Sequence, residues 1–155
     1  MSEGAQEAGS PTQDERVMAA VAHATIIFSA VGLIGPLIIW GTQKEKSPFL
    51  AFQALQAAAY QFLLLLGGLL AGALYMCSFL TMPVTALLSA PFDERAAVCF
   101  PFLAFSCTFG ILFVLMLAWL AYVGYGLFAA VSVLQGNDFR YVFLGPRLER
   151  YLEQS

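Results

Sequence analysis

The sequence predicts an all-α integral membrane protein, a helical bundle of about three transmembrane helices with an interfacial amphipathic helix at its C-terminus. Two observations predict this fold class. Apolar residues make up 60% of the chain, and charged residues only 11%, against roughly 25% in soluble domains. The hydrophobic core of a small soluble domain cannot enclose so much apolar surface, so the hydrocarbon of a bilayer must cover it.

Three long apolar stretches give the domain organisation. Polar residues 1–14 predict a disordered tail, and a helical membrane domain follows over residues 15–136. Its predicted spans are about 17–40, 58–80 and 98–134, each able to cross a hydrocarbon core of ~30 Å at about 1.5 Å per residue. The third stretch exceeds one span, so it is either a single tilted helix or it breaks.

Local signals mark several helix ends. Ser47 is a good N-cap and Pro48 suits a first helical position, so the second helix should begin there. Pro101 lies near the start of the third helix, where it should not break it. Gly136 predicts the end of that helix. Two prolines within residues 81–92 favour a loop.

The C-terminal residues 137–155 are amphipathic. Pro146 can start a short helix that places Leu148, Tyr151 and Leu152 on one face. Such a helix lies in the membrane interface with its charged face in water.

The basic residues predict an orientation. In the three-span fold Arg16 and Arg95 fall on one side, and the other five fall on the opposite side: Lys44, Lys46, Arg140, Arg147 and Arg150. The positive-inside rule then places the N-terminus outside and the C-terminus in the cytoplasm. Splitting the third stretch would give four spans, with both termini on one side. A net charge of -3 without a basic stripe argues against nucleic acid as a partner.

Small residues form a stripe along the first span. They recur at steps of three and four, at Ala22, Thr25, Ser29, Gly32 and Pro36. Small residues let helices approach closely in lipid, so the stripe favours a helix–helix contact, and a pore-lining face is the alternative. The same small-xxx-small spacing occurs at two further pairs: Gly68 with Gly72, and Gly126 with Ala130.

Polar residues within the spans are functional candidates. His23, the only histidine, could be an axial ligand to haem or to a chlorophyll magnesium, or could relay a proton. It could equally be a neutral side chain that hydrogen-bonds a neighbouring helix. Gln53, Gln56 and Tyr60 share one face of the second helix and could line a polar path.

Catalytic motifs are missing from the sequence. There is no HExxH, no GxSxG, no phosphate loop and no acidic pair within a span, so we expect no enzyme. The cysteines, Cys77, Cys99 and Cys107, form no CxxC motif and are expected to be small apolar residues. We predict no metal site and no cofactor, with lipids as the expected ligands.

Three blocks of sequence resemble a known family. They are "DERVMAAVAHATIIFSAVGLIGPLIIW" at 14–40, "KEKSPFLAFQALQA" at 44–57 and "AAVSVLQGNDFRYVFLGPRL" at 129–148. The family comprises small bacterial and archaeal membrane proteins of unknown function, distantly related to the twenty-kilodalton subunit of the chloroplast inner-envelope import translocon. This sequence departs from the family pattern at Gln53, where His is usual, and at Val142, where Pro is usual.

The resemblance implies a protein of about three spans, located in a bacterial inner membrane, but no particular activity. Three hypotheses for its role follow. The first is a non-enzymatic structural or accessory subunit of a larger membrane complex, whose partners are other membrane subunits or further copies of itself. The second is a transport or translocation component, and the third is a subunit that binds a pigment or haem through His23.

Overall fold

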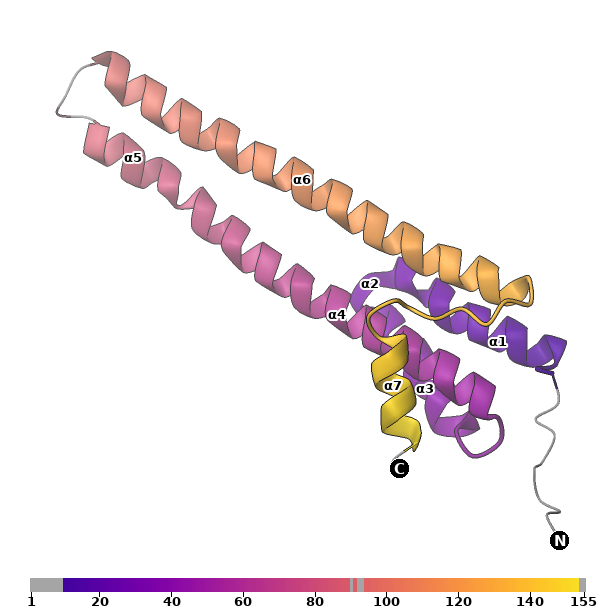
Figure 1. The fold of residues 1–155 in the computed structure, drawn as a ribbon. Coiled ribbons are helices and arrows are strands. Elements are labelled where there is room, and N and C mark those ends of the chain that lie inside the picture. The colour runs from indigo at the N-terminus through magenta and orange to yellow at the C-terminus, as the bar shows by residue number, and fades with distance from the viewer. Residues whose placement is uncertain (1–9, 90, 92–93, 154–155) are drawn as a thin grey trace, which may run out of the picture. The chain divides into compact units, whose positions relative to one another are not determined.

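The protein is described by a computed structural model covering residues 10–89, 91 and 94–153 (Figure 1). All regular elements in this part of the chain are helical, which confirms the predicted fold class. Judged by length and composition alone, three stretches could cross a membrane, namely Gln13–Gly32, Pro48–Leu88 and Val98–Leu134, and the first of them is interrupted by a turn. Most of the predicted N-terminal tail lies outside the described residues.

The chain divides into two compact units. Unit 1 comprises Met1–Phe62 and Tyr125–Ser155, and unit 2 comprises Leu63–Gly124. Two helices, α4 (Pro48–Phe79) and α6 (Glu94–Leu134), contribute residues to both. Since unit 1 contains the predicted polar residues, its packing determines where they lie.

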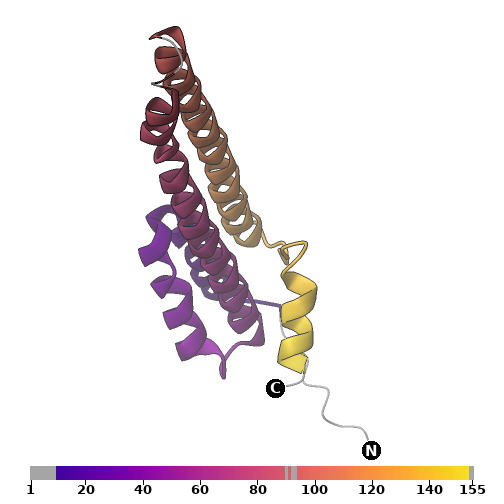
Figure 2. The same ribbon diagram turned by 90° about the vertical axis from the view of Figure 1, so that its left-hand side faces the viewer.

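The first apolar stretch is a helical hairpin. It consists of α1 (Gln13–Ala24), a 3-10 turn at Thr25–Phe28, the short α2 (Ser29–Gly32) and α3 (Ile34–Gln43), which returns beside α1 (Figures 1 and 2). The prediction of a single helix through 17–40 is therefore wrong. The run Thr25-Ile26-Ile27 is β-branched and favours helix weakly, so the helix can end there.

The return of α3 is visible in its contacts with α1. Ile39 packs against Ala19 and Ala22, while Gly35 lies close to the Thr25 side chain, so the two helices are antiparallel. Ser29 turns the chain with φ 52°, a left-handed conformation that costs a non-glycine residue roughly 1–3 kcal/mol. The hairpin therefore depends on its packing to hold this turn.

The later helices follow the local signals closely. Helix α4 begins at Pro48, and the Leu50 amide donates to the Ser47 hydroxyl at 3.2 Å, as predicted for an N-cap. Helix α6 continues without a break past Pro101. It ends before Gly136, whose φ of +95° suits a glycine.

One further region differs from its prediction, and another forms the helix that was predicted. Residues 81–92 were predicted as a loop, but α5 occupies Thr81–Ser89, with Pro83 in the first turn where proline is tolerated. Helix α7 (Gly145–Glu153) forms where Pro146 predicted a short helix, and Leu148 is half-buried. The side chains of Tyr151 and Leu152 lie outside the described set.

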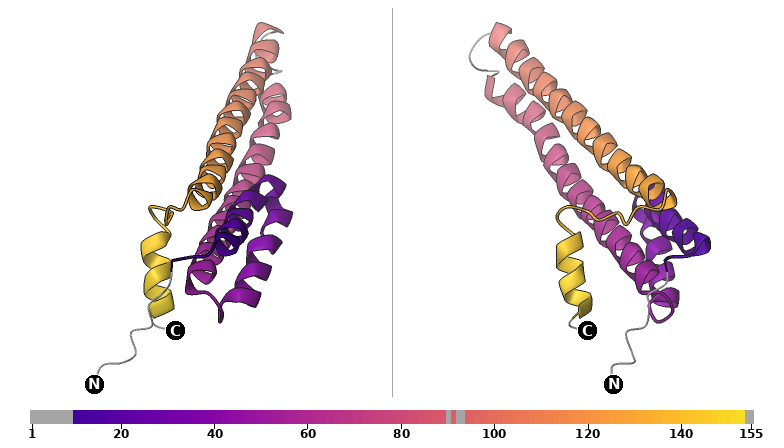
Figure 3. Two further views of the ribbon diagram at one scale, coloured as in Figure 1. Left: turned by 90° about the vertical axis from the view of Figure 1, so that its right-hand side faces the viewer. Right: turned by 45° about the vertical axis from the view of Figure 1, so that its right-hand side comes forward.

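The core of unit 1 joins the hairpin to the ends of α4 and α6. Ala19 packs with Leu50 and Val133, and Ala22 packs with Ala54 and Ala57. Helix α1 therefore runs parallel to α4, and α6 runs antiparallel to both (Figure 3). Alanines at these positions bring the helix backbones close together.

Candidate functional site

His23 lies at the centre of a buried polar cluster in unit 1. Its Nδ1 atom is 3.2 Å from the Tyr141 hydroxyl, and its Nε2 atom is 3.1 Å from Oε1 of Gln53. The amide oxygen of Gln53 can only accept, so Nε2 carries the proton and Nδ1 accepts from Tyr141. His23 is 1% exposed, and both ring nitrogens of this neutral imidazole have protein partners.

Gln53 and Gln56 connect this histidine to the segment after α6. Gln53 Nε2 donates to the Asp138 carboxylate at 3.2 Å and to the Phe139 carbonyl at 3.1 Å. Gln56 donates to the same carbonyl at 3.1 Å, and its Oε1 accepts from the Tyr141 amide at 2.9 Å. These two side chains thus bond the Phe139 carbonyl and the Tyr141 amide of the segment to α4.

Aromatic rings surround Tyr141. Tyr60 is stacked on it with ring centroids 4.1 Å apart. Tyr125 and Phe139 meet it edge-on, at 5.4 Å and 5.0 Å. Edge-on contacts add attraction beyond buried area. We call His23, Gln53, Gln56, Asp138 and Tyr141 the His23 network.

The outer end of the His23 network reaches the surface. Asp138 pairs with Arg140 at 2.7 Å, and Arg140 also pairs with Glu149 of α7. The hydrogen bond from Arg140 to Asp138 raises the pKa of the guanidinium above its ordinary value. One carboxylate thus connects buried Gln53 to an ion pair that is half exposed.

A second polar contact lies at the turn of the hairpin. Gln61 Nε2 donates to the Ala22 carbonyl and to the Thr25 hydroxyl, both at 3.0 Å. Thr25 donates in turn to the Ala22 carbonyl at 2.8 Å. Backbone groups released where α1 ends are therefore satisfied by α4, as lipid requires.

The small residues predicted to pack helices fall into three groups. Ala22, Gly32, Pro36, Gly126 and Ala130 are buried in unit 1, and a Cβ at Gly126 would lie 2.8 Å from Ile26. Thr25 and Ser29 belong to the hairpin turn rather than to a continuous helical stripe. Gly68 and Gly72, in unit 2, have no atoms within 4 Å of an added Cβ.

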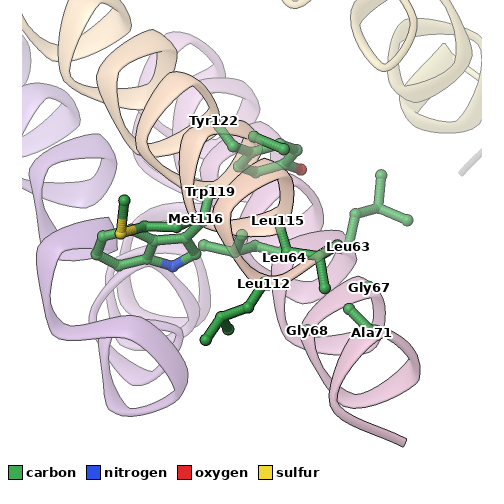
Figure 4. A pocket seen from close by; sticks show the side chains of 11 residues that line it. Leu63, Leu64, Gly67, Gly68, Ala71, Leu112, Leu115, Met116, Trp119 and Tyr122 are labelled. Atoms are coloured by element: carbon green, nitrogen blue, oxygen red, sulfur yellow. The ribbon is translucent and has the colours of Figure 1, made fainter. Parts of the chain in front are cut away.

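Unit 2 has an apolar pocket of about 380 Å³ between segments of α4 and α6 (Figure 4). Gly67, Gly68 and Ala71 leave space on the α4 side, and Leu112, Met116 and Trp119 contribute from α6. Its lining offers mainly van der Waals contact. The pocket is separate from the His23 network, which lies wholly in unit 1.

Metal-binding geometry is not found in the described part of the chain. No three or more His, Cys, Asp or Glu side chains there are grouped so as to hold a metal ion. Cys77, Cys99 and Cys107 are free and exposed. A metal at His23 would first have to displace Tyr141 or Gln53 from its ring.

A protein-family model, the magnetosome magnetite crystal formation protein family, matches residues 14–148. The chain belongs to this family. The match covers nearly the whole described chain. It includes both parts of the chain that form the His23 network, namely α1 with α4 and the segment after α6. No curated protein and no solved structure matched the chain.

Membership in the magnetosome family agrees with the expectation of a small bacterial membrane protein family, and the protein is an integral membrane protein. The comparisons give no support to a distant relation with the chloroplast import translocon. The sequence resemblance and the family match cover the same range, which begins just after α1 starts and ends within α7.

Several residues of the site were not predicted. Asp138, Phe139 and Gln61 were not singled out, and Tyr141 entered only as part of the block 129–148 that resembles the family. A signal was present, because glutamines three residues apart on an apolar helix need partners in lipid. The segment that supplies them begins at the polar run Asn137-Asp138, which was assigned to the interfacial tail.

Proposed function

We propose that this protein is a non-enzymatic accessory subunit of the magnetosome membrane that supports magnetite crystal formation, without a cofactor of its own. One observation carries the proposal beyond family membership. The ring nitrogens of His23 and the amide groups of Gln53 and Gln56 all bond to protein groups. These residues therefore act in assembly of unit 1, where they attach the segment after α6 to α1 and α4.

The alternative roles make other demands on the same residues. A transport path lined by Gln53, Gln56 and Tyr60 requires them to face water, and all three are buried in unit 1. Haem ligation requires a free nitrogen on His23. The accessory role needs neither rearrangement, so it is the function that this geometry supports best.

The crystal-formation role is tested in a magnetite-forming bacterium that lacks its own copy of this protein. We expect electron microscopy to show smaller or fewer crystals in the deletion strain, and restoration by the wild-type gene. Gln56→Leu should restore less than wild type because it loosens unit 1, whereas Gln135→Leu, an exposed glutamine, should restore fully. Unchanged crystal size and number in the deletion strain would contradict the proposal.

We further propose an orientation, different from that predicted by sequence. The guanidinium of Arg16 lies 5.9 Å from the Phe49 ring and beside Gly136, so the start of α1 meets the start of α4 and the end of α6. In the proposed orientation Arg16 therefore lies on the same side of the membrane as Lys44, Lys46 and the three C-terminal arginines. Arg95 lies at the start of the 41-residue α6, and we propose that this helix carries it to the other side of the membrane.

The basic residues then divide six against one, which is a stronger asymmetry than the predicted five against two. The positive-inside rule favours the side with six in the cytoplasm. Both the N-terminal segment and the segment after α6 would face the cytoplasm, and the turn between α5 and α6 would face the opposite compartment, the magnetosome lumen.

Cysteine labelling tests this orientation. With Cys77, Cys99 and Cys107 replaced by alanine, Asp14→Cys, Gln135→Cys and Pro91→Cys are each treated with a membrane-impermeant maleimide. In spheroplasts of a bacterium without magnetosomes, whose inner membrane then carries the protein, only Pro91→Cys should be labelled, and in inverted vesicles only the other two. Labelling of Asp14→Cys from outside, with Gln135→Cys protected, would restore the opposite-termini topology.

A further inference from the structure

The hairpin of unit 1 is too shallow to cross a bilayer and return. Helix α1 has 12 residues and α3 has 10, which correspond to about 18 Å and about 15 Å of helix. The hydrocarbon core is about 30 Å thick. With the four-residue 3-10 turn at about 2.0 Å per residue, the longer arm measures about 26 Å. Its first turn carries Asp14, Glu15 and Arg16, so the hairpin ends inside the hydrocarbon core instead of crossing it.

The surface of the hairpin matches this placement. Around its turn, large apolar side chains point away from the protein, with Phe28 69% and Val31 70% exposed. Ile34 and Ile38 continue this exposed surface along α3. The open end carries Arg16, Lys44 and Lys46 instead. Lipid tails therefore surround the turn, and headgroups meet the charges.

We infer that the α1–α3 hairpin inserts into one leaflet only and makes the protein prefer a membrane curved toward that leaflet. Two helices about 10 Å across add roughly 160 Å² to the leaflet they enter. Among the described residues, the rest of the chain supplies the long helices α4 and α6, the short α5 between them and the short α7 after them, and no second hairpin of this kind. Added area in one leaflet is accommodated best where that leaflet is convex.

The partner in this inference is the lipid bilayer itself. If the orientation proposed above holds, the hairpin lies in the cytoplasmic leaflet, which is the convex one in a vesicle that lies within the cell. The protein would then accumulate on small closed vesicles rather than on flat membrane. The curvature preference itself depends on the hairpin alone and requires neither iron nor crystal formation.

Orientation in vesicles of different size provides the test. Purified full-length Thr42→Cys protein, with the native cysteines replaced, is reconstituted from one detergent into phosphatidylcholine–phosphatidylglycerol vesicles, either small and sonicated or large and extruded. An impermeant maleimide then reports the fraction with the hairpin's open end outward. We expect about a twofold or larger excess outward in small vesicles, since insertion of apolar helices is curvature-sensitive, and no such bias in large ones.

Two paired variants separate the hairpin from other causes. Phe28→Asp with Val31→Asp should abolish the size dependence, because charges at the turn cannot enter the hydrocarbon. Phe28→Leu with Val31→Leu keeps the turn apolar and should retain it. Equal outward fractions in both vesicle sizes, for the Thr42→Cys protein with an unaltered turn, overturn the inference. It is also overturned if the aspartate pair keeps the full size dependence. Circular dichroism and gel filtration establish that each variant is folded, and Phe28→Ser with Val31→Ser replaces the aspartate pair if it is not.

Discussion

Replacing Gly32 with alanine should destabilise the protein more than any other single methyl group added to the hairpin. A Cβ at Gly32 would lie 2.0 Å from the Thr25 carbonyl oxygen and 2.8 Å from its carbon. Both are backbone atoms of Thr25, so neither can move aside by a side-chain rotation. We expect a loss of at least about 3 kcal/mol, the upper end of ordinary overpacking.

The measurement is thermal unfolding of detergent-purified protein, followed by circular dichroism. For a chain of this length, 3 kcal/mol corresponds to a decrease in Tm of roughly 6 to 12 °C. Gly41→Ala is the matched control, because it lies in α3 with no atom within 4 Å of the added methyl. It should leave Tm unchanged or raise it slightly, since alanine favours helix over glycine. Equal Tm values for the two variants would show that the hairpin turn is not closely packed.

Gln56→Leu should release the segment that follows α6 from the rest of unit 1. Gln56 is fully buried, and the leucine would leave the Tyr141 amide without its acceptor and remove one donor from the Phe139 carbonyl. An orphaned buried group costs about 1–3 kcal/mol. We expect a loss in this range, concentrated in residues 137–145 rather than spread over the helices.

Limited trypsin digestion measures this local release. Cleavage after Arg140 requires the segment to leave its site, so its rate follows the population of the open form when opening is fast. A cost of 1.4 to 2.8 kcal/mol raises that population roughly 10- to 100-fold. Gln135→Leu, whose side chain is exposed, should be cleaved at the wild-type rate. Identical cleavage rates for Gln56→Leu and wild type would mean that the segment is held by other contacts.

Helix ends and helix class could be predicted because their signals are local. Ser47 and Pro48 start α4, Gly136 follows the end of α6, and each acts within one turn of chain. The N-terminal capping box of Thr12 and Glu15 is equally local, with the Thr12 amide donating to the Glu15 carboxylate at 2.7 Å. That the chain is a membrane protein could be predicted from its excess of apolar residues alone, without any pattern in their order.

The hairpin could not be predicted because hydrophobicity does not distinguish a span from a return in lipid. Residues 17–40 are apolar throughout, and both arms face hydrocarbon. Gly32 and Pro36 were predicted to belong to a helical stripe, whereas Gly35 between them allows close approach of α3 to Thr25. The turn depends on the approach of Gly32 to Thr25 and on Gln61 of α4, which are tertiary contacts.

The partners of His23 were hidden for a different reason. Tyr141 is 118 residues away in sequence, and Gln56 is separated from the Tyr141 amide by 85. Polarity alone identified His23, Gln53 and Gln56 as candidates. Nothing in the one-dimensional pattern showed that the polar residues 137–141, predicted to be an interfacial tail, close over them.

That separation also constrains the order in which the protein can be made. At about 5 to 20 residues per second, translation of the 118 residues between His23 and Tyr141 takes roughly 6 to 24 s. Late in this time the imidazole and both glutamines have been synthesised, whereas their partners in Asp138, Phe139 and Tyr141 have not. We therefore expect the nascent chain to wait at the insertion machinery or at the aqueous interface, so that the membrane domain closes only after translation of its last third.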